Sequence, residues 1–248
     1  MIDIAKNTVF TTPDRAIWVD LNWHPSPDQL EKFVLFQKLL YEWNHQINLT
    51  RLIAGNDYWI SQVFDSLWPF QLELAMPQLQ RKIIDVGSGC GFPGLALAIA
   101  LSGAEVTLIE AIKKKKEALE SIIKELKLDS RVEIINERVE VTGQNPIFRE
   151  LFDISMARAV GADPVVAEYL IPLTRIEGKA ILFKGQWTKV DLQRLNKSLI
   201  NLKANIKNVQ RINLPENRGI RHIVNLKKND NCPKKYPRRT GVPKKNPL

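Results

Sequence analysis

Along most of the chain, short apolar runs of strand length alternate with longer segments whose apolar residues recur at helical spacing. The runs predict five strands, at 82–86, 105–109, 132–136, 152–157 and 179–184. The helical spacing predicts helices at 92–101, 113–127, 163–171 and 189–203. Two further strand-like runs, 209–212 and 221–226, follow without a helix between them and predict a hairpin. This order predicts an α/β fold with a doubly wound, mostly parallel, seven-stranded sheet of the Rossmann-like kind.

The first part of the chain has a different pattern. Residues 1–25 show no period and are expected to form an irregular lead-in. At Ser26 the sequence Ser-Pro-Asp-Gln has the features of a helix start, and the spacing that follows predicts a helix to about Asn44. A second helix is predicted from Tyr58 to Leu67. The expected organisation is an N-terminal helical extension over 1–75, an α/β domain over 76–226 and a basic extended arm over 227–248.

Length and cysteine content narrow the class of protein. A chain of 248 residues suits one α/β domain with an extension. Its start lacks the charged-then-apolar pattern of a signal peptide, and its longest apolar run, 92–101, is too short to cross a bilayer. The two cysteines, Cys90 and Cys232, lie far apart and form no C-x-x-C pair. We therefore expect free thiols, a cytoplasmic location, no metal site and no membrane partner.

Positive charge is concentrated at the C-terminal end. The last 22 residues carry eight lysines and arginines against one acid, Asp230, and so supply +7 of the formal net charge of +9. Residues 230–248 also contain four prolines and few aliphatic side chains, so we expect an extended arm that does not pack. Basic arms typically bind polyphosphates such as RNA, because each neutralised phosphate releases counterions; the alternative is a tail that only aids solubility. The expected RNA contacts are Lys234, Lys235, Arg238, Arg239, Lys244 and Lys245.

A glycine-rich loop follows the first strand of the predicted sheet. Residues 83–94 have the sequence IIDVGSGCGFPG, and Glu110 ends the next apolar run. Glycines let the backbone approach a ligand and adopt positive φ, and a carboxylate at the end of the neighbouring strand suits two ribose hydroxyls. The loop matches both the G-x-G-x-x-G of dinucleotide-binding enzymes and the acid-x-G-x-G-x-G of S-adenosylmethionine methyltransferases.

Two features favour the methyl donor over a nicotinamide cofactor. Asp85 precedes the glycines, and a pyrophosphate disfavours a nearby carboxylate, whereas a sulfonium with an α-ammonium group tolerates one. The hairpin at the end of the sheet is typical of seven-strand methyltransferases and not of two symmetric Rossmann halves. A structural glycine turn without a ligand is the third alternative.

Several motifs, taken in order, resemble one family. They are WN at 43–44 with INLT at 47–50, DSL at 65–67, the loop DVGSGCGFPG, KK at 114–115, RVE at 138–140, ARA at 157–159, KGQ at 184–186 and YPRRTGVP at 236–243. In order and spacing they resemble the bacterial small-subunit ribosomal RNA guanine-N7 methyltransferases, also called glucose-inhibited division protein B. The resemblance covers most of the chain and implies a cytoplasmic class I methyltransferase that uses S-adenosyl-L-methionine to methylate 16S rRNA. The family carries an arginine and a histidine where this chain has Ser61 and Gln62.

The resemblance also implies which residues contact the cofactor. They are Gly87, Gly89 and Phe92 in the loop, Glu110, Ala111 and Ile112 after the second strand, Val139 and Glu140 after the third, and Arg158 at the end of the fourth. The residue types fit these places, since Glu110 would hold the ribose and 139–140 would lie beside the adenine ring. From the residues alone, a solvated Glu140 and a surface ion pair at Arg158 remain alternatives.

The chemistry of methyl transfer limits the side chains that are needed. Transfer from a sulfonium is an in-line displacement that depends mainly on positioning. The Asn/Asp-Pro-Pro-aromatic loop typical of exocyclic amine methylation is absent, and neither cysteine is placed for pyrimidine C5 methylation. Guanine N7 has a free lone pair and needs no general base, which is consistent with the resemblance but does not select N7 by itself. Arg158 and Lys184 are the candidate catalytic residues, for positioning or charge stabilisation, and the lysines at 113–116 either bind phosphate or form a solvated face.

Three other functions stay open. They are an RNA-binding ribosome-assembly factor with a vestigial cofactor site, a methyltransferase for a protein or small molecule, and a nicotinamide oxidoreductase. The intact Asp85, Gly87, Gly89 and Glu110 disfavour the first, the basic arm disfavours the second, and the hairpin disfavours the third.

Overall fold

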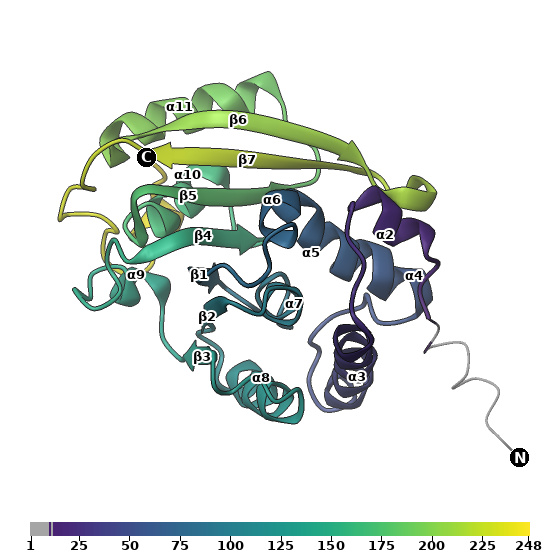
Figure 1. Ribbon diagram of the computed structural model, residues 1–248. Helices are drawn as coiled ribbons and strands as arrows, with labels where there is room; N and C mark the ends of the chain where they lie inside the picture. Colours follow the sequence, from purple (N-terminus) through teal and green to yellow (C-terminus); the bar gives the residue numbers. More distant parts are fainter. Residues whose placement is uncertain (1–9, 11) are drawn as a thin grey trace, which may run out of the picture.

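Seven strands form one sheet in the order β3-β2-β1-β4-β5-β7-β6 (Figure 1). The structure is a computed structural model that describes residues 10 and 12–248. The strands are β1 (Arg81–Val86), β2 (Ala104–Ile109), β3 (Val132–Ile135), β4 (Phe152–Arg158), β5 (Thr174–Lys184), β6 (Ala204–Asn213) and β7 (Ile220–Lys228). β7 is antiparallel to both its neighbours, and the other pairings are parallel. The predicted mostly parallel sheet and its closing hairpin are confirmed.

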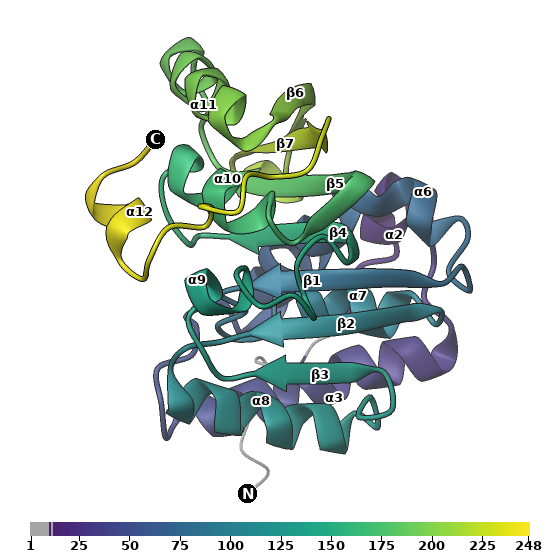
Figure 2. The same cartoon turned by 90° about the vertical axis from the view of Figure 1, so that its left-hand side faces the viewer.

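Helices cover both faces of the sheet, because alternate residues of each strand point to opposite sides. Ile83 belongs to one buried cluster and Ile84 to another. On the side of Ile83 lie α7 (Gly94–Ala100) and α8 (Lys113–Glu125) with the N-terminal helices. On the side of Ile84 lie α9 (Val139–Thr142), α10 (Asp163–Leu170) and α11 (Lys189–Leu202) (Figure 2).

The N-terminal part is more helical than expected. The irregular lead-in is wrong at α2 (Ala16–Asp20), where Ile17 and Trp18 are buried against the core and so favour a helical turn. The predicted helix after Ser26 is confirmed as α3 (Pro27–Asn44), with a capping box in which Ser26 and Gln29 each bond the other's backbone N–H. The second predicted helix is a continuous series of turns. They are α4 (Gly55–Tyr58), a π-helical segment (Trp59–Phe64), α5 (Asp65–Leu67), a 3-10 turn (Trp68–Phe70) and α6 (Gln71–Leu74).

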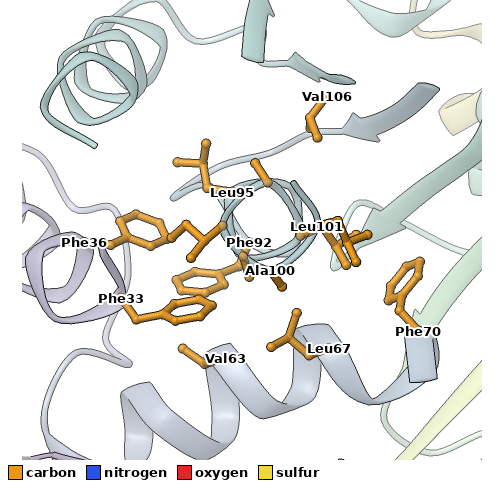
Figure 3. Packing of buried hydrophobic residues seen from close by; sticks show 14 of the residues in the cluster. Phe33, Phe36, Val63, Leu67, Phe70, Phe92, Leu95, Ala100, Leu101 and Val106 are labelled. Carbon is orange, nitrogen blue, oxygen red and sulfur yellow. The ribbon is translucent and has the colours of Figure 1, made fainter. Parts of the chain in front are cut away.

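Aromatic side chains join these N-terminal helices to the glycine loop. Phe92 of the loop stacks on Phe36 of α3, with ring centroids 4.8 Å apart, and both are buried. Tyr58 packs edge-on against Phe92 at 5.8 Å. Figure 3 shows Phe92 next to Phe33 and Phe36 of α3. The N-terminal helices therefore support the loop directly, and the site depends on them.

The C-terminal segment, residues 229–248, is packed against the protein, so the expectation of an arm that does not pack is wrong. Cys232 and Tyr236 are each 4% exposed, and Val242–Lys245 forms the short helix α12. The segment has few aliphatic residues, as the sequence shows, but it is held by polar contacts to buried side chains. Apart from α12, its backbone is irregular.

Candidate functional site

The glycine loop between β1 and α7 has a conformation that requires glycine. Gly87 and Gly91 have φ values of +72° and +95°, in the left-handed region. A Cβ on Gly87 would lie 2.8 Å from Val160, and one on Gly91 would lie 2.7 Å from Leu95. Both the backbone angles and the available space therefore exclude a side chain at these positions. Without side chains, the backbone of the loop can lie close to the ends of β1 and β2.

Asp85 fastens the two ends of this loop. It is 1% exposed at the end of β1, and its Oδ2 accepts a hydrogen bond of 3.0 Å from the N–H of Gly94, the first residue of α7. Among the described residues, no donor bonds its other oxygen, Oδ1. Burial raises the pKa of Asp85 to about 7, although the Gly94 N–H and the charge of Arg158 lower it.

Glu110 lies after β2, as predicted, next to the glycine loop. One carboxylate oxygen accepts the N–H of Gly89 at 3.0 Å, and the other accepts the N–H of Ile112 at 2.8 Å. A carboxylate oxygen has two lone pairs, so each retains room for one further donor. Ile112 is 53% exposed, which is high for an isoleucine beside a buried carboxylate. Together they offer acceptors for hydroxyl groups and an apolar face for a flat ring.

A pocket of about 660 Å³ lies at the carboxyl ends of β1, β2, β4 and β5. This is the size of a small-molecule site and the position at which open α/β sheets bind ligands. The predicted residues on its wall are Gly87, Gly89, Phe92, Glu110, Ile112, Arg158 and Lys184. The structure therefore brings together most of the predicted cofactor residues with both candidate catalytic residues.

Arg158, at the end of β4, is held by contacts that the sequence did not reveal. Its guanidinium donates to the Ser61 carbonyl and to Asp65 Oδ2, each at 3.3 Å, and to the Gln62 side chain. The guanidinium carbon also lies 5.7 Å from the centre of the Phe92 ring. From the hairpin, Arg221 Nε approaches the other Asp65 oxygen at 3.3 Å.

These partners come from distant parts of the chain. Gln62 is on the π-helix, Asp65 on α5 and Arg221 on β7, and all three line the pocket. The DSL motif at 65–67 was the only sequence signal for Asp65, and it carried no role. Arg221 had none.

Lys184, at the end of β5, is also paired with a carboxylate. Its Nζ lies 2.6 Å from Asp163 Oδ1, and Trp187 Nε1 donates to Asp163 Oδ2 at 2.9 Å. The Asp163 side chain is 5% exposed, whereas that of Lys184 is partly exposed. Lys184 and Arg158 are thus both ion-paired with aspartates, and Asp65 is shared between Arg158 and Arg221.

The sequence of this chain matches the family model described as rRNA small subunit methyltransferase G over residues 29–224. The chain belongs to this family. It is 50% identical over 245 residues to the ribosomal RNA small subunit methyltransferase G of Prochlorococcus marinus strain MIT 9313, with 99% of each chain covered. It is 47% identical over 236 residues to that of Parasynechococcus marenigrum strain WH8102, with 95% of each covered.

Among solved structures, an O-methyltransferase from Bacillus cereus in complex with SAH has a similar fold. Its TM-score is 0.55 and its sequence identity 18%, over 77% of this chain and 89% of that chain. The likeness shows that the Rossmann-like methyltransferase fold predicted from the strand order is present.

Two positions set this chain apart from the motif expected for the family. Ser61 and Gln62 stand where an arginine and a histidine were expected. Gln62 is 1% exposed, and its amide nitrogen donates to Thr50 Oγ1 at 3.1 Å while its oxygen accepts from Arg158. A neutral side chain here binds Arg158 by a hydrogen bond, and Asp65 remains the partner that balances its charge.

The remaining predicted cofactor residues lie outside this pocket. Ala111 is exposed beside Glu110, and Val139 and Glu140 are buried in α9, where Glu140 is 2% exposed. Glu140 Oε1 accepts the hydroxyl of Tyr169 at 3.2 Å and the N–H of Gly241 at 2.9 Å. The structure thus places Glu140 against the C-terminal segment.

The predicted RNA contacts divide into two kinds. Lys234, Lys235, Arg239, Lys244 and Lys245 are exposed. Arg238 instead forms a two-pronged ion pair with Glu168 of α10, whose side chain is fully buried. Glu168 is the one acid in the middle of an otherwise apolar helix, and that isolated charge was the available signal for a buried partner.

The lysines at 113–116 are also not equivalent. Lys115 lines the pocket, whereas Lys113 and Lys116 lie near Glu117 and Glu120, one turn along α8. Whether these lysines bind phosphate or form a solvated face stays a prediction.

Within the part of the chain that the structure describes, no cluster of side chains suits a metal ion, and no helix is long and apolar enough to span a membrane. Both cysteines are free and buried. Burial raises the pKa of Cys232 to about 11, so it is a thiol at neutral pH.

Proposed function

We propose that this protein transfers a methyl group from S-adenosyl-L-methionine to N7 of a guanine in small-subunit (16S) ribosomal RNA. The observation that carries the proposal is the pocket in which the glycine loop and Glu110 face Arg158 and Lys184. Near-complete coverage of relatives named as small-subunit rRNA methyltransferases supports the substrate. A cytoplasmic location follows from that substrate.

The residues of the pocket fit the methyl donor. Glu110 has lone pairs left for the ribose hydroxyls, and Ile112 offers an exposed apolar surface for the adenine ring. Because Gly87 and Gly89 have no side chain, the methionine part of the cofactor can approach their backbone. When bound, the sulfonium supplies an electrophilic methyl group, and the chain has to place the base in line with it.

The charge arrangement suits an N7 acceptor. The N7 lone pair attacks without losing a proton, so no general base is required, and the methylated purine carries a positive charge. A bare cation beside that ring would oppose the reaction. Asp65 pairs with Arg158 and Asp163 with Lys184, so neither cation is bare, and their remaining N–H groups can donate to the guanine O6 and to phosphate.

The proposal is tested by incubating labelled methyl donor with small subunits that lack the modification. Labelled 16S RNA that breaks at one new guanine after borohydride and aniline treatment is the expected result. Label in the RNA without a new break would exclude N7, and label in a ribosomal protein would favour the protein methyltransferase. RNA binding with no label under any condition would favour the assembly factor.

Equilibrium binding separates the cofactors. S-adenosylhomocysteine should bind, and NADH should not compete with it. A preference for NADH would contradict the proposal at its first step. Substituting Arg158→Met should abolish transfer. Retained binding of S-adenosylhomocysteine in this variant would place the arginine at the base, and lost binding would place it at the cofactor.

A further inference from the structure

Arg238 is bound to the protein as closely as any residue of the C-terminal segment. Its Nε donates to Glu168 Oε1 at 2.9 Å, its Nη2 to Oε2 at 2.6 Å, and its backbone N–H to Oε1 at 2.8 Å. Nη2 also donates to the Asn246 carbonyl at 2.8 Å, which closes the segment on itself. The Glu168 side chain is fully buried, and the ion pair with Arg238 offsets the cost of removing its charge from water.

A second buried carboxylate holds the segment three residues further on. Glu140 of α9 accepts the N–H of Gly241 at 2.9 Å, and Gly241 has a φ of +82° that favours glycine. The same Glu140 oxygen accepts the Tyr169 hydroxyl, next to Glu168 on α10. Arg238 and Gly241 are therefore fixed to α10 and α9 by neighbouring carboxylates.

The loop after α9 is held by the same segment. Arg149 donates to the carbonyls of Cys232 and Tyr236 at 2.6 and 2.7 Å, and Gln144 donates to the carbonyl of Pro237 at 2.7 Å. A Cβ on Gly143 would lie 2.7 Å from the Pro237 ring. Residues 139–149 are thus fastened to the C-terminal segment along their length, on the side of the sheet that Figure 2 shows with α9 and α10.

α9 begins four residues after β3, at the edge of the sheet where the pocket lies. Val139 belongs to the same buried cluster as Val86 and Ile109, the last residues of β1 and β2. Between β3 and α9, Asn136 donates its side-chain amide to the Glu110 carbonyl at 2.7 Å. The segment that leads into α9 therefore contacts the backbone of Glu110.

We propose that Arg238, bound to α10, and Gly241, bound to α9, form a clamp that holds α9 in place and sets the affinity of the pocket for its cofactor. In this role Arg238 is a positioning residue, and it is not an RNA contact like its exposed neighbour Arg239. The clamp itself rests on the contacts above, and only the identity of the ligand rests on the proposed function.

The test compares Arg238→Met with Arg239→Met, because the side chain of Arg238 binds Glu168 and the Asn246 carbonyl, whereas its neighbour Arg239 is exposed. In the ligand-free protein, backbone amides at 139–149 should exchange with deuterium about tenfold faster in the first variant and at the wild-type rate in the second. The dissociation constant for S-adenosylhomocysteine should rise about tenfold in the first variant alone. The KM for the methyl donor should rise with it while kcat is retained, and RNA binding should weaken only in Arg239→Met.

A destabilised control variant distinguishes a specific effect on α9 from a general loss of stability. Leu74→Ala, in α6, removes a buried side chain away from α9, so it should lower Tm without changing exchange at 139–149 or the affinity for S-adenosylhomocysteine. Arg238→Lys keeps the charge but loses the two-pronged geometry, and should lie between wild type and Arg238→Met.

Wild-type exchange and wild-type affinity in Arg238→Met would overturn the clamp. So would a loss of affinity no larger than that of Leu74→Ala. A wild-type protein that does not bind S-adenosylhomocysteine would overturn the proposed function and the link to the cofactor, whereas the exchange comparison in ligand-free protein would still decide whether Arg238 holds α9.

Discussion

The N-terminal helices and the C-terminal segment both cover the α/β domain, but they are held in opposite ways. The N-terminal helices, α3 to α6, pack through fully buried aromatic and aliphatic side chains such as Phe36 and Phe64. The C-terminal segment is held mainly by hydrogen bonds and ion pairs to Glu140, Glu168 and Arg149. The N-terminal helices reach the pocket through Phe92, and we propose that the C-terminal segment acts on it through α9.

The difference shows why one covering could be predicted and the other could not. Apolar packing leaves a local period in the sequence, and α3 was readable from its capping box and spacing. A buried ion pair between residues 70 positions apart leaves no local pattern. The basic residues of the segment looked alike in the sequence, and the structure separates Arg238 from the rest.

The largest effect is expected from the apolar covering. Phe36→Ala removes a buried ring that stacks on Phe92, and should lower the free energy of unfolding by about 4 kcal/mol. Phe36→Leu should cost much less, because it refills most of the space. Urea unfolding of both variants measures this, and equal midpoints for Phe36→Ala and wild type would show that the aromatic contact is not needed.

The anchor at the start of the C-terminal segment should have a smaller effect. Lys228 is fully buried and donates to Glu150 at 2.6 Å and to the Thr174 carbonyl at 2.8 Å. Lys228→Ala removes the charged donor from both acceptors, although the N–H of Cys232 still binds Glu150 Oε1 at 2.9 Å, and should cost about 2 kcal/mol, since Glu150 is partly exposed. Lys227→Ala, at an exposed ion pair, is the matched control and should change stability by less than about 0.5 kcal/mol. Similar losses in the two variants would contradict the polar anchoring.

The buried carboxylate of Asp85 gives a pH-dependent comparison. Its pKa is about 7 in the folded protein and near 3.8 in the unfolded chain, so the folded state binds the extra proton between these values. Wild-type stability should therefore fall relative to Asp85→Asn as the pH rises from 4 through 7, and the difference should level off above that. Thermal unfolding at several pH values measures it. A difference that does not vary with pH would mean that the carboxyl titrates normally.

The smallest effect on stability is expected from the exposed lysines of α12. Replacing Lys244 and Lys245 by alanine should change the free energy of unfolding by less than about 0.5 kcal/mol. RNA binding should weaken, and the slope of log affinity against log salt should fall by about 0.7–0.9 for each lost phosphate contact. An unchanged slope would show that these lysines only aid solubility.

For the site, prediction worked where chemistry and local pattern coincide. The glycine loop follows β1 and Glu110 follows β2. These two strands are consecutive in the sequence and paired in the sheet, so the strand-turn-helix order is enough to place the loop beside Glu110. The contacts of Asp65 and Gln62 with Arg158, and of Arg221 with Asp65, could not be predicted. They form only after the N-terminal helices and the hairpin fold over the sheet. Glu140 was assigned beside the cofactor, and its contacts with Gly241 became visible only in three dimensions.

The most direct test of the central claim is a crystal structure of this protein with S-adenosylhomocysteine. The ribose hydroxyls should lie within hydrogen-bond distance of Glu110, with the adenine ring against Ile112 and the sulfur facing Arg158 and Lys184. A ligand bound elsewhere, or bound here with its adenosine turned away from Glu110, would contradict the assignment of this pocket to the methyl donor.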